Sequence, residues 1–128
     1  VRGGEVRNLH VTGCDVESNQ GEKRPPTANV LIDSTGGSNA EVAITGNTIQ
    51  HNHNAAGGAN IRIKGPSARV VKGTDEARDG HVTITGNVVS DVKVNVHLDH
   101  ARGVVITGNT FWTAYEHNLL AENSAYVT

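Results

Sequence analysis

Val82–Asn87 (VTITGN) and Val104–Asn109 (VVITGN) are two copies of one pattern, in which a β-branched run ends in Thr-Gly-Asn. Val42–Asn47 (VAITGN) is a third copy, and Leu9–Cys14 (LHVTGC) is a divergent one with cysteine in place of asparagine. The glycines of neighbouring copies are 33, 40 and 22 residues apart. Spacings of about 20 to 50 residues are typical of stacked repeats. The pattern therefore indicates a short repeated unit that is lengthened by insertions.

A second, weaker repeat lies between the copies of the first. Its members alternate apolar and polar residues, and they are Asn29–Asp33, Asn60–Lys64, Asn95–Asp99 and Asn118–Glu122. This alternation is typical of a short strand with one face in the core and the other in water. Two strands and their turns fit in 22 residues, whereas a strand and a crossover helix do not. The sequence therefore predicts an all-β chain, a parallel β-helix (solenoid) of about four coils, forming one domain over residues 1–128.

The Thr-Gly-Asn pattern is followed two residues later by Ile49, Val89 or Phe111. In this it resembles the repeats of right-handed parallel β-helix proteins, the pectate-lyase-like superfamily of extracellular polysaccharide-acting enzymes and their non-catalytic relatives. The resemblance covers nearly the whole chain. It implies a right-handed, single-stranded coil and a secreted, cell-surface or periplasmic protein. The repeated residues build the coil, so the resemblance is specific for architecture and not for reaction.

Each repeated residue type has a physical role in such a coil. We expect the isoleucines of the pattern (Ile44, Ile84 and Ile106) to stack in a column inside it. The glycines (Gly46, Gly86 and Gly108) permit a sharp bend. The asparagines (Asn47, Asn87 and Asn109) can pass amide hydrogen bonds from coil to coil. Cys14 occupies the asparagine position of the first copy, so we expect this ladder to weaken there.

The charge and composition of the chain limit the classes of partner that it is expected to bind. The net charge of −2 gives no basic footprint for nucleic acid or for an anionic membrane. One cysteine excludes an internal disulfide, and no apolar run approaches the ~18 residues of a membrane span. We therefore expect neither nucleic acid nor a membrane as a partner.

The two ends of the chain show no capping pattern. Ala125–Thr128 aligns with the lead-in to a further Thr-Gly-Asn. Uncapped repeats are poorly soluble or pair with neighbours. We expect this polypeptide to be part of a longer solenoid, or to self-associate through its uncapped coil ends.

Three segments exceed the minimal coil, namely residues 17–28, 50–59 and 65–80. Loops on a rigid scaffold often carry function. They are equally well explained as tolerated surface insertions, because lengthening an exposed loop costs little.

Aligning the second repeat places its outward residues in two columns, which are Leu31, Arg62, His97 and Leu120, and Asp33, Lys64, Asp99 and Glu122. Neighbouring strands lie ~4.8 Å apart, so Asp33, Lys64 and Asp99 would form an acid-base-acid ladder. One interpretation is a surface ladder of ion pairs that fixes strand register. The other is a site that faces an acidic or neutral polysaccharide.

Two reactions fit the site interpretation. In a lyase, Lys64 or His97 would remove the sugar proton and Arg62 would neutralise the uronate carboxylate. Calcium held on Asp or Glu is an alternative neutraliser and the one cofactor left open, with no metal ligand assigned. In a hydrolase, two carboxylates act, and Asp33 and Asp99 would lie ~9.6 Å apart, near the upper limit for an inverting pair. Asp99 with Asp91 or His100 is a further option.

Two aromatic residues complete the candidate set. Trp112 points outward if Phe111 points inward, and Tyr115 follows closely. Exposed rings of this kind can stack on sugars, cover a coil end or meet a partner. We assign Arg62, His100, Trp112 and Tyr115 to substrate binding, and Lys64, His97, Asp99 and Asp33 to catalysis.

Two function classes remain. One is a segment of a secreted carbohydrate-active protein of the lyase, hydrolase or epimerase type. The other is a non-catalytic structural or glycan-binding module, such as part of a tailspike or surface protein. The sequence leaves open whether the protein is an enzyme.

Overall fold

The structure, a computed structural model, describes residues 1–19, 28–52, 57–66 and 80–128. This described part contains eleven β-strands and no helix, and every strand pairing in it is parallel. It holds no helix long and apolar enough to cross a bilayer. The prediction of an all-β chain with parallel strands is confirmed.

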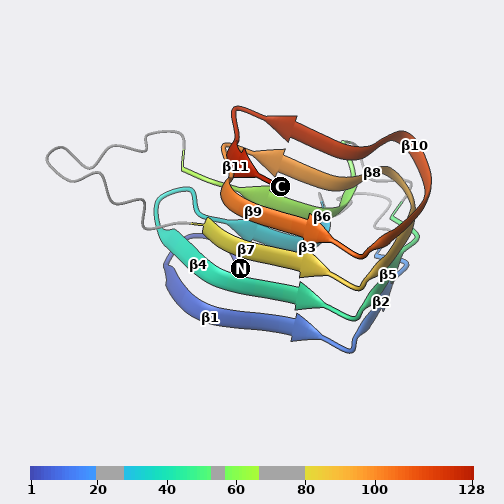
Figure 1. Cartoon of the computed structure of the whole chain (residues 1–128), viewed down its shortest axis with the longest axis horizontal. Coiled ribbons are helices and arrows are strands. Elements are labelled where there is room, and N and C mark those ends of the chain that lie inside the picture. Colours follow the sequence, from blue (N-terminus) through green and yellow to red (C-terminus); the bar gives the residue numbers. More distant parts are fainter. Residues whose placement is uncertain (20–27, 53–56, 67–79) are drawn as a thin grey trace, which may run out of the picture.

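The first of two sheets has five strands, which are stacked in chain order (Figure 1). They are β1 (Glu5–Thr12), β4 (Ser38–Thr45), β7 (Gly80–Thr85), β9 (Arg102–Thr107) and β11 (Ala125–Val127). Each of them pairs with the corresponding strand of the next repeat. The Thr-Gly-Asn copies thus form the ends of neighbouring strands in one sheet.

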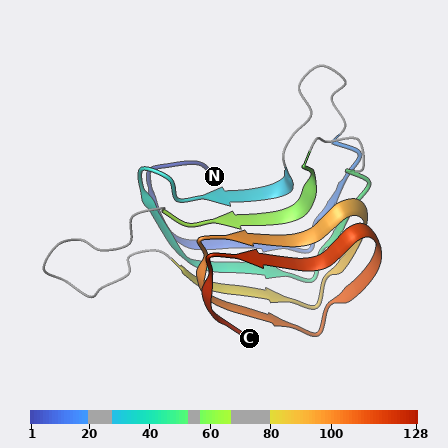
Figure 2. The same ribbon diagram turned by 90° about the horizontal axis from the view of Figure 1, so that it is seen from above.

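The second sheet has six strands, and the chain alternates between the two sheets (Figure 2). They are β2 (Asp15–Glu17), β5 (Thr48–Gln50), β8 (Val88–Asp99), β6 (Ala59–Lys64), β3 (Ala28–Asp33) and β10 (Thr110–Glu122). The start of β8 pairs with β5 and its end pairs with β6. The long strand β10 pairs with β8 at both ends. The sheet therefore has two parts, and the part formed by β3, β6 and the ends of β8 and β10 is called the distal face below.

A column of bends separates the two parts of this sheet. Its members have positive φ angles of 55°, 56°, 55° and 44°, at Ser18, His51, Asp91 and Thr113. Positive φ is uncommon outside glycine, so the same turn recurs here against the intrinsic backbone preference. The first two bends follow β2 and β5, whereas the last two lie within β8 and β10. A strand can therefore turn a corner and pair on both sides of it.

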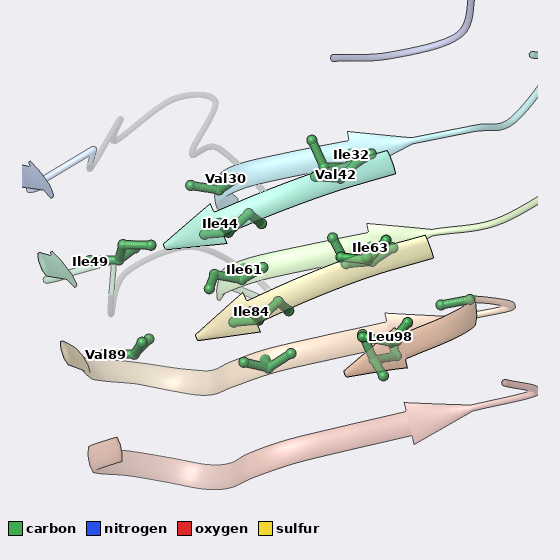
Figure 3. Packing of buried hydrophobic residues seen from close by; sticks show 14 residues of the cluster. Val30, Ile32, Val42, Ile44, Ile49, Ile61, Ile63, Ile84, Val89 and Leu98 are labelled. Atoms are coloured by element: carbon green, nitrogen blue, oxygen red, sulfur yellow. The ribbon is translucent and has the colours of Figure 1, made fainter. Parts of the chain in front are cut away.

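The core lies between the two sheets and is built from stacked aliphatic side chains (Figure 3). Ile44 is in register with Ile84, and Ile84 is in register with Ile106, which confirms the predicted column. Ile49, Val89 and Phe111 are also in register, as expected. Burying each aliphatic side chain contributes about 1.5 to 3 kcal/mol. These columns hold the repeats in one register, because a slip by one residue would turn them to water.

The predicted asparagine ladder is present at the corner between the sheets. The Nδ2 atom of Asn47 donates to Oδ1 of Asn87 at 2.9 Å, and that of Asn87 donates to Oδ1 of Asn109 at 2.8 Å. The preceding glycines have positive φ, as the bend requires. At Cys14 only the backbone amide donates to Asn47, at 3.0 Å. The ladder therefore loses its side-chain bond in the first repeat, as predicted.

A second asparagine ladder corrects the expectation that polar residues of the second repeat face water. Asn60 and Asn95 are fully buried. Side-chain hydrogen bonds run from Asn29 to Asn60 at 2.8 Å, from Asn60 to Asn95 at 3.2 Å and from Asn95 to Asn118 at 2.9 Å. Burial is tolerated because the amides satisfy one another and nearby carbonyls. The first residue of the pattern is thus internal in the two central copies, at Asn60 and Asn95, and is exposed at Asn118.

Candidate functional site

The distal face carries an open hollow of about 330 Å³. Its lining residues are Arg2, Leu31, Asp33, Arg62, Lys64, His97 and Asp99. The strand register aligns two columns of residues across the four strands. One column is Leu31, Arg62, His97 and Leu120, and the other is Asp33, Lys64, Asp99 and Glu122. Both predicted columns are therefore present, and five of the eight predicted site residues line one hollow.

A chain of hydrogen bonds runs across the hollow. The Nε atom of Arg62 donates to Nδ1 of His97 at 3.1 Å, and Nε2 of His97 lies 2.9 Å from Oε2 of Glu122. The guanidinium of Arg62 also donates through Nη2 to the backbone carbonyl of Gly57. Burial lowers the pKa of Arg62, while the charge of Asp99 acts in the opposite direction. Arginine nevertheless keeps its charge at neutral pH.

Asp33 is a buried carboxylate rather than the exposed one that the alternation predicted. Its Oδ1 accepts from the backbone amide of Thr35 at 2.9 Å, and its Oδ2 lies 3.2 Å from Nε of Arg2. Burial alone would raise its pKa, but the hydrogen bonds from Thr35 and the charges of Lys64 and Arg2 outweigh burial, so the pKa is lowered. Arg2 was missed by sequence reasoning, because residues before the first repeat align with nothing.

The expected ladder of ion pairs does not form. Within the part of the chain that the structure describes, no ion pair joins Lys64 to Asp33 or to Asp99. Asp33 is held by Arg2 and Thr35, and Asp99 is held by its neighbour His100. The ammonium of Lys64 is therefore available in the hollow between two carboxylates whose positions other groups fix.

The predicted partners of Asp99 are only partly brought together. Nδ1 of His100 lies 2.6 Å from Oδ1 of Asp99, so these two groups do form a pair. Asp91 instead stands at the bend of β8, where Ser90 donates to it at 2.8 Å. Asp91 therefore lies at the bend and Asp99 in the hollow, in different parts of the sheet.

The two aromatic candidates lie apart from the hollow. Trp112 is 72% exposed and Tyr115 is 56% exposed, both on β10, which confirms that Trp112 points outward. Neither lines the hollow. In register, Trp112 is opposite Ser90 at the start of β8, on the other side of the bend. The rings therefore lie outside the hollow that Arg62 lines.

A second polar cluster surrounds the bend residue His51. Its Nδ1 lies 2.9 Å from Oε2 of Glu17, and its Nε2 lies 3.6 Å from Oδ2 of Asp91. Hydrogen bonds from His51 and Gln50 lower the pKa of Glu17. The sequence did not predict this cluster, since its members come from three repeats and fall outside both patterns. In the described ranges no group of three or more His, Cys, Asp or Glu side chains, this cluster included, is placed so that it could hold a metal ion.

Comparisons with known proteins identify no relative of this chain. No protein-family model, curated protein or solved structure matches this chain. The central parts of the three insertions, residues 20–27, 53–56 and 67–79, lie outside the described residues, so the prediction that they build a site stays a prediction.

Proposed function

We propose that this chain is a segment of a right-handed parallel β-helix whose distal face binds polysaccharide in the hollow around Lys64. The proposal of a β-helix is supported by parallel pairing of each strand with its counterpart one repeat later. The right hand follows from the general preference of parallel crossover connections. A secreted or cell-surface location goes with this proposal through the resemblance of the repeats.

The binding proposal rests on which side chains line the hollow and on how firmly they are held in place. It presents cationic donors, carboxylate acceptors and the apolar side chain of Leu31 within one depression of about 330 Å³. Sugar hydroxyls both donate and accept, so they suit a surface that offers both kinds of group. Arg62, His97 and Asp33 are each fixed by hydrogen bonds or an ion pair. Little side-chain ordering is therefore left to oppose binding.

Binding is favoured over catalysis by the state of His97. Both of its ring nitrogens are engaged, by Arg62 and by Glu122. A general base must be free to take a proton from the substrate. If the hollow is that of a lyase, Lys64 is therefore the base, because within the described residues it alone among the lining cations has neither a hydrogen bond nor an ion pair.

Calorimetric titration with a panel of acidic and neutral oligosaccharides tests the binding proposal. We expect binding, and we expect Lys64→Ala to weaken it by about tenfold or more, because hydrogen bonds to charged groups are strong. Lys93→Ala is the matched control, since Lys93 lies on β8 away from the hollow and pairs with Glu116 at 3.3 Å. Equal losses in both variants, or no binding across the panel, would refute the proposal.

The same wild-type and variant proteins can be used to distinguish a binding module from a lyase. Incubation with uronate polymers produces unsaturated products that absorb in the ultraviolet only if a lyase reaction occurs. Product formation that Lys64→Ala abolishes would establish catalysis at the hollow. Binding without product would establish the non-catalytic module.

A further inference from the structure

The position of the protons on His97 follows from the groups beside it. Arginine has donors and no acceptor, so Nδ1 of His97 must accept the 3.1 Å hydrogen bond from Nε of Arg62. The other ring nitrogen, Nε2, then carries the proton and donates to Glu122 at 2.9 Å. The arrangement therefore requires neutral His97 with its proton on Nε2.

Protonation of His97 is incompatible with this arrangement. A proton on Nδ1 removes the acceptor of Arg62 and places an imidazolium against a guanidinium. The charged groups that face His97 are Arg62 and Lys64 on β6, Asp99 on its own strand and Glu122 on β10. Glu122 keeps its hydrogen bond to Nε2 in either state, so the ring stays in place. Arg62 is the group that must move.

Arg62 has room to move into the hollow. Its remaining hydrogen bond goes to the carbonyl of Gly57, and it already lines the hollow beside Lys64. The carboxylate of Asp33 on β3 keeps its charge as the pH falls, because its pKa is lowered. Arg2 stays on Asp33, at 3.2 Å. Histidine is the side-chain type whose charge ordinarily changes in mildly acidic solution, and His97 contacts Arg62 directly, whereas His100 contacts Asp99.

We propose that His97 is a pH-dependent switch for the hollow: neutral His97 holds Arg62, and protonated His97 releases Arg62 to bind an anionic group of the ligand. This inference rests on the proposed function for its ligand but not for its mechanism. Arg62 and protonated His97 would then both lie close to the bound anion, and Lys64 would be a third cation beside it. Affinity for an acidic oligosaccharide increases as the pH falls, whereas affinity for a neutral one changes little.

Nuclear magnetic resonance of the wild-type chain tests the mechanism without any ligand. We expect the Nε2-protonated tautomer of His97 near neutral pH, and a change in the Arg62 Nε–H signal that follows the titration of His97. A signal of Arg62 that is insensitive to that titration, or a proton on Nδ1 in the neutral state, would overturn the proposal. Because no ligand is present, this result does not depend on the proposed function.

Binding of an oligouronate between about pH 7.5 and about pH 5.5, the range in which histidines change charge, tests the consequence. We expect wild-type affinity to rise by about fivefold or more, since a unit charge is added next to the anion. Glutamine in His97→Gln offers Arg62 a permanent neutral acceptor, so the rise should disappear. His10→Gln, at an exposed position of β1 in the first sheet and away from the hollow, is the matched control and should retain it.

The outcomes are separable. A rise that His10→Gln abolishes and His97→Gln retains would overturn the role of His97. Failure of every oligosaccharide to bind would remove the proposed function, and the ligand-free titration would still decide the switch. Spectra of both variants that match the wild type exclude misfolding as the cause.

Discussion

Cys14 stands where each later repeat has an asparagine. This position therefore allows the contribution of one side-chain hydrogen bond of the ladder to stability to be measured. Asn47 donates to Asn87 through both its backbone and its side chain, whereas Cys14 reaches Asn47 through its backbone alone. Cys14 is exposed, so a larger polar side chain meets no steric barrier there. The missing bond was predictable, because the exchange is visible in aligned repeats.

Replacing Cys14 with asparagine should restore the ladder. We expect Cys14→Asn to raise the free energy of unfolding by about 1 kcal/mol, the net contribution of one hydrogen bond. Urea denaturation measures the difference, and Cys14→Ala, which adds no amide, should stay close to the wild type. Equal stability of the two variants would mean that the side-chain bond contributes nothing.

Asp33 should make part of the stability depend on pH. Its pKa is lowered in the folded protein, so its contribution is full above the unfolded value of about 3.9 and is lost as the pH falls through the folded value. We expect the stability difference between wild type and Asp33→Asn to shrink below about pH 4. Thermal denaturation as a function of pH measures it. The variant Asp15→Asn, at an exposed carboxylate on β2, is the control for the general effect of removing one carboxylate.

The strands show why some features could be predicted and others could not. Alternation allows one register only, so the columns of Ile84 and of Lys64 followed from the sequence. The burial of Asn60 did not follow, because alternation distinguishes faces and cannot show that a polar residue lies at an internal corner. Nor did the partners of His97, which depend on how long side chains reach across strands rather than on register.

The second asparagine ladder should stabilise β3, β6 and β8 together. Asn60 accepts from Asn29 and donates to Asn95 and to the carbonyl of Ser90. Asn60→Ala leaves these buried groups without partners, so we expect a loss of about 2 to 4 kcal/mol in unfolding free energy. Chemical denaturation measures the loss. Asn118→Ala at the exposed end of the ladder is the control and should lose about 1 kcal/mol or less.

The open ends of the molecule expose core columns. Leu119 is in register with buried Val96 and is 44% exposed, because within the described residues no strand covers β10 on its outer side. Unpaired strand edges favour association with a further chain. We expect self-association of this polypeptide through these ends, with a second copy covering β10.

Sedimentation over a range of concentrations measures this association. Leu119→Lys should weaken it, because a charge would then lie in the apolar contact. Val105→Lys is a matched control, since Val105 is also 44% exposed but lies on β9 at a position facing away from the column of Ile106. A wild-type chain that remains monomeric at high concentration would contradict the expectation.

The candidate site exists only if each repeat lies on the next in the stated register, because this alone brings Arg62, Lys64, His97 and Asp99 into one hollow. Methyl-labelled isoleucine spectra of the 13.5 kDa chain, which has seven isoleucines, test it most directly. We expect strong nuclear Overhauser contacts between Ile44 and Ile84 and between Ile84 and Ile106, with a weaker one or none between Ile44 and Ile106. Absence of the two neighbour contacts in a folded sample would contradict the stacking, and the hollow with it.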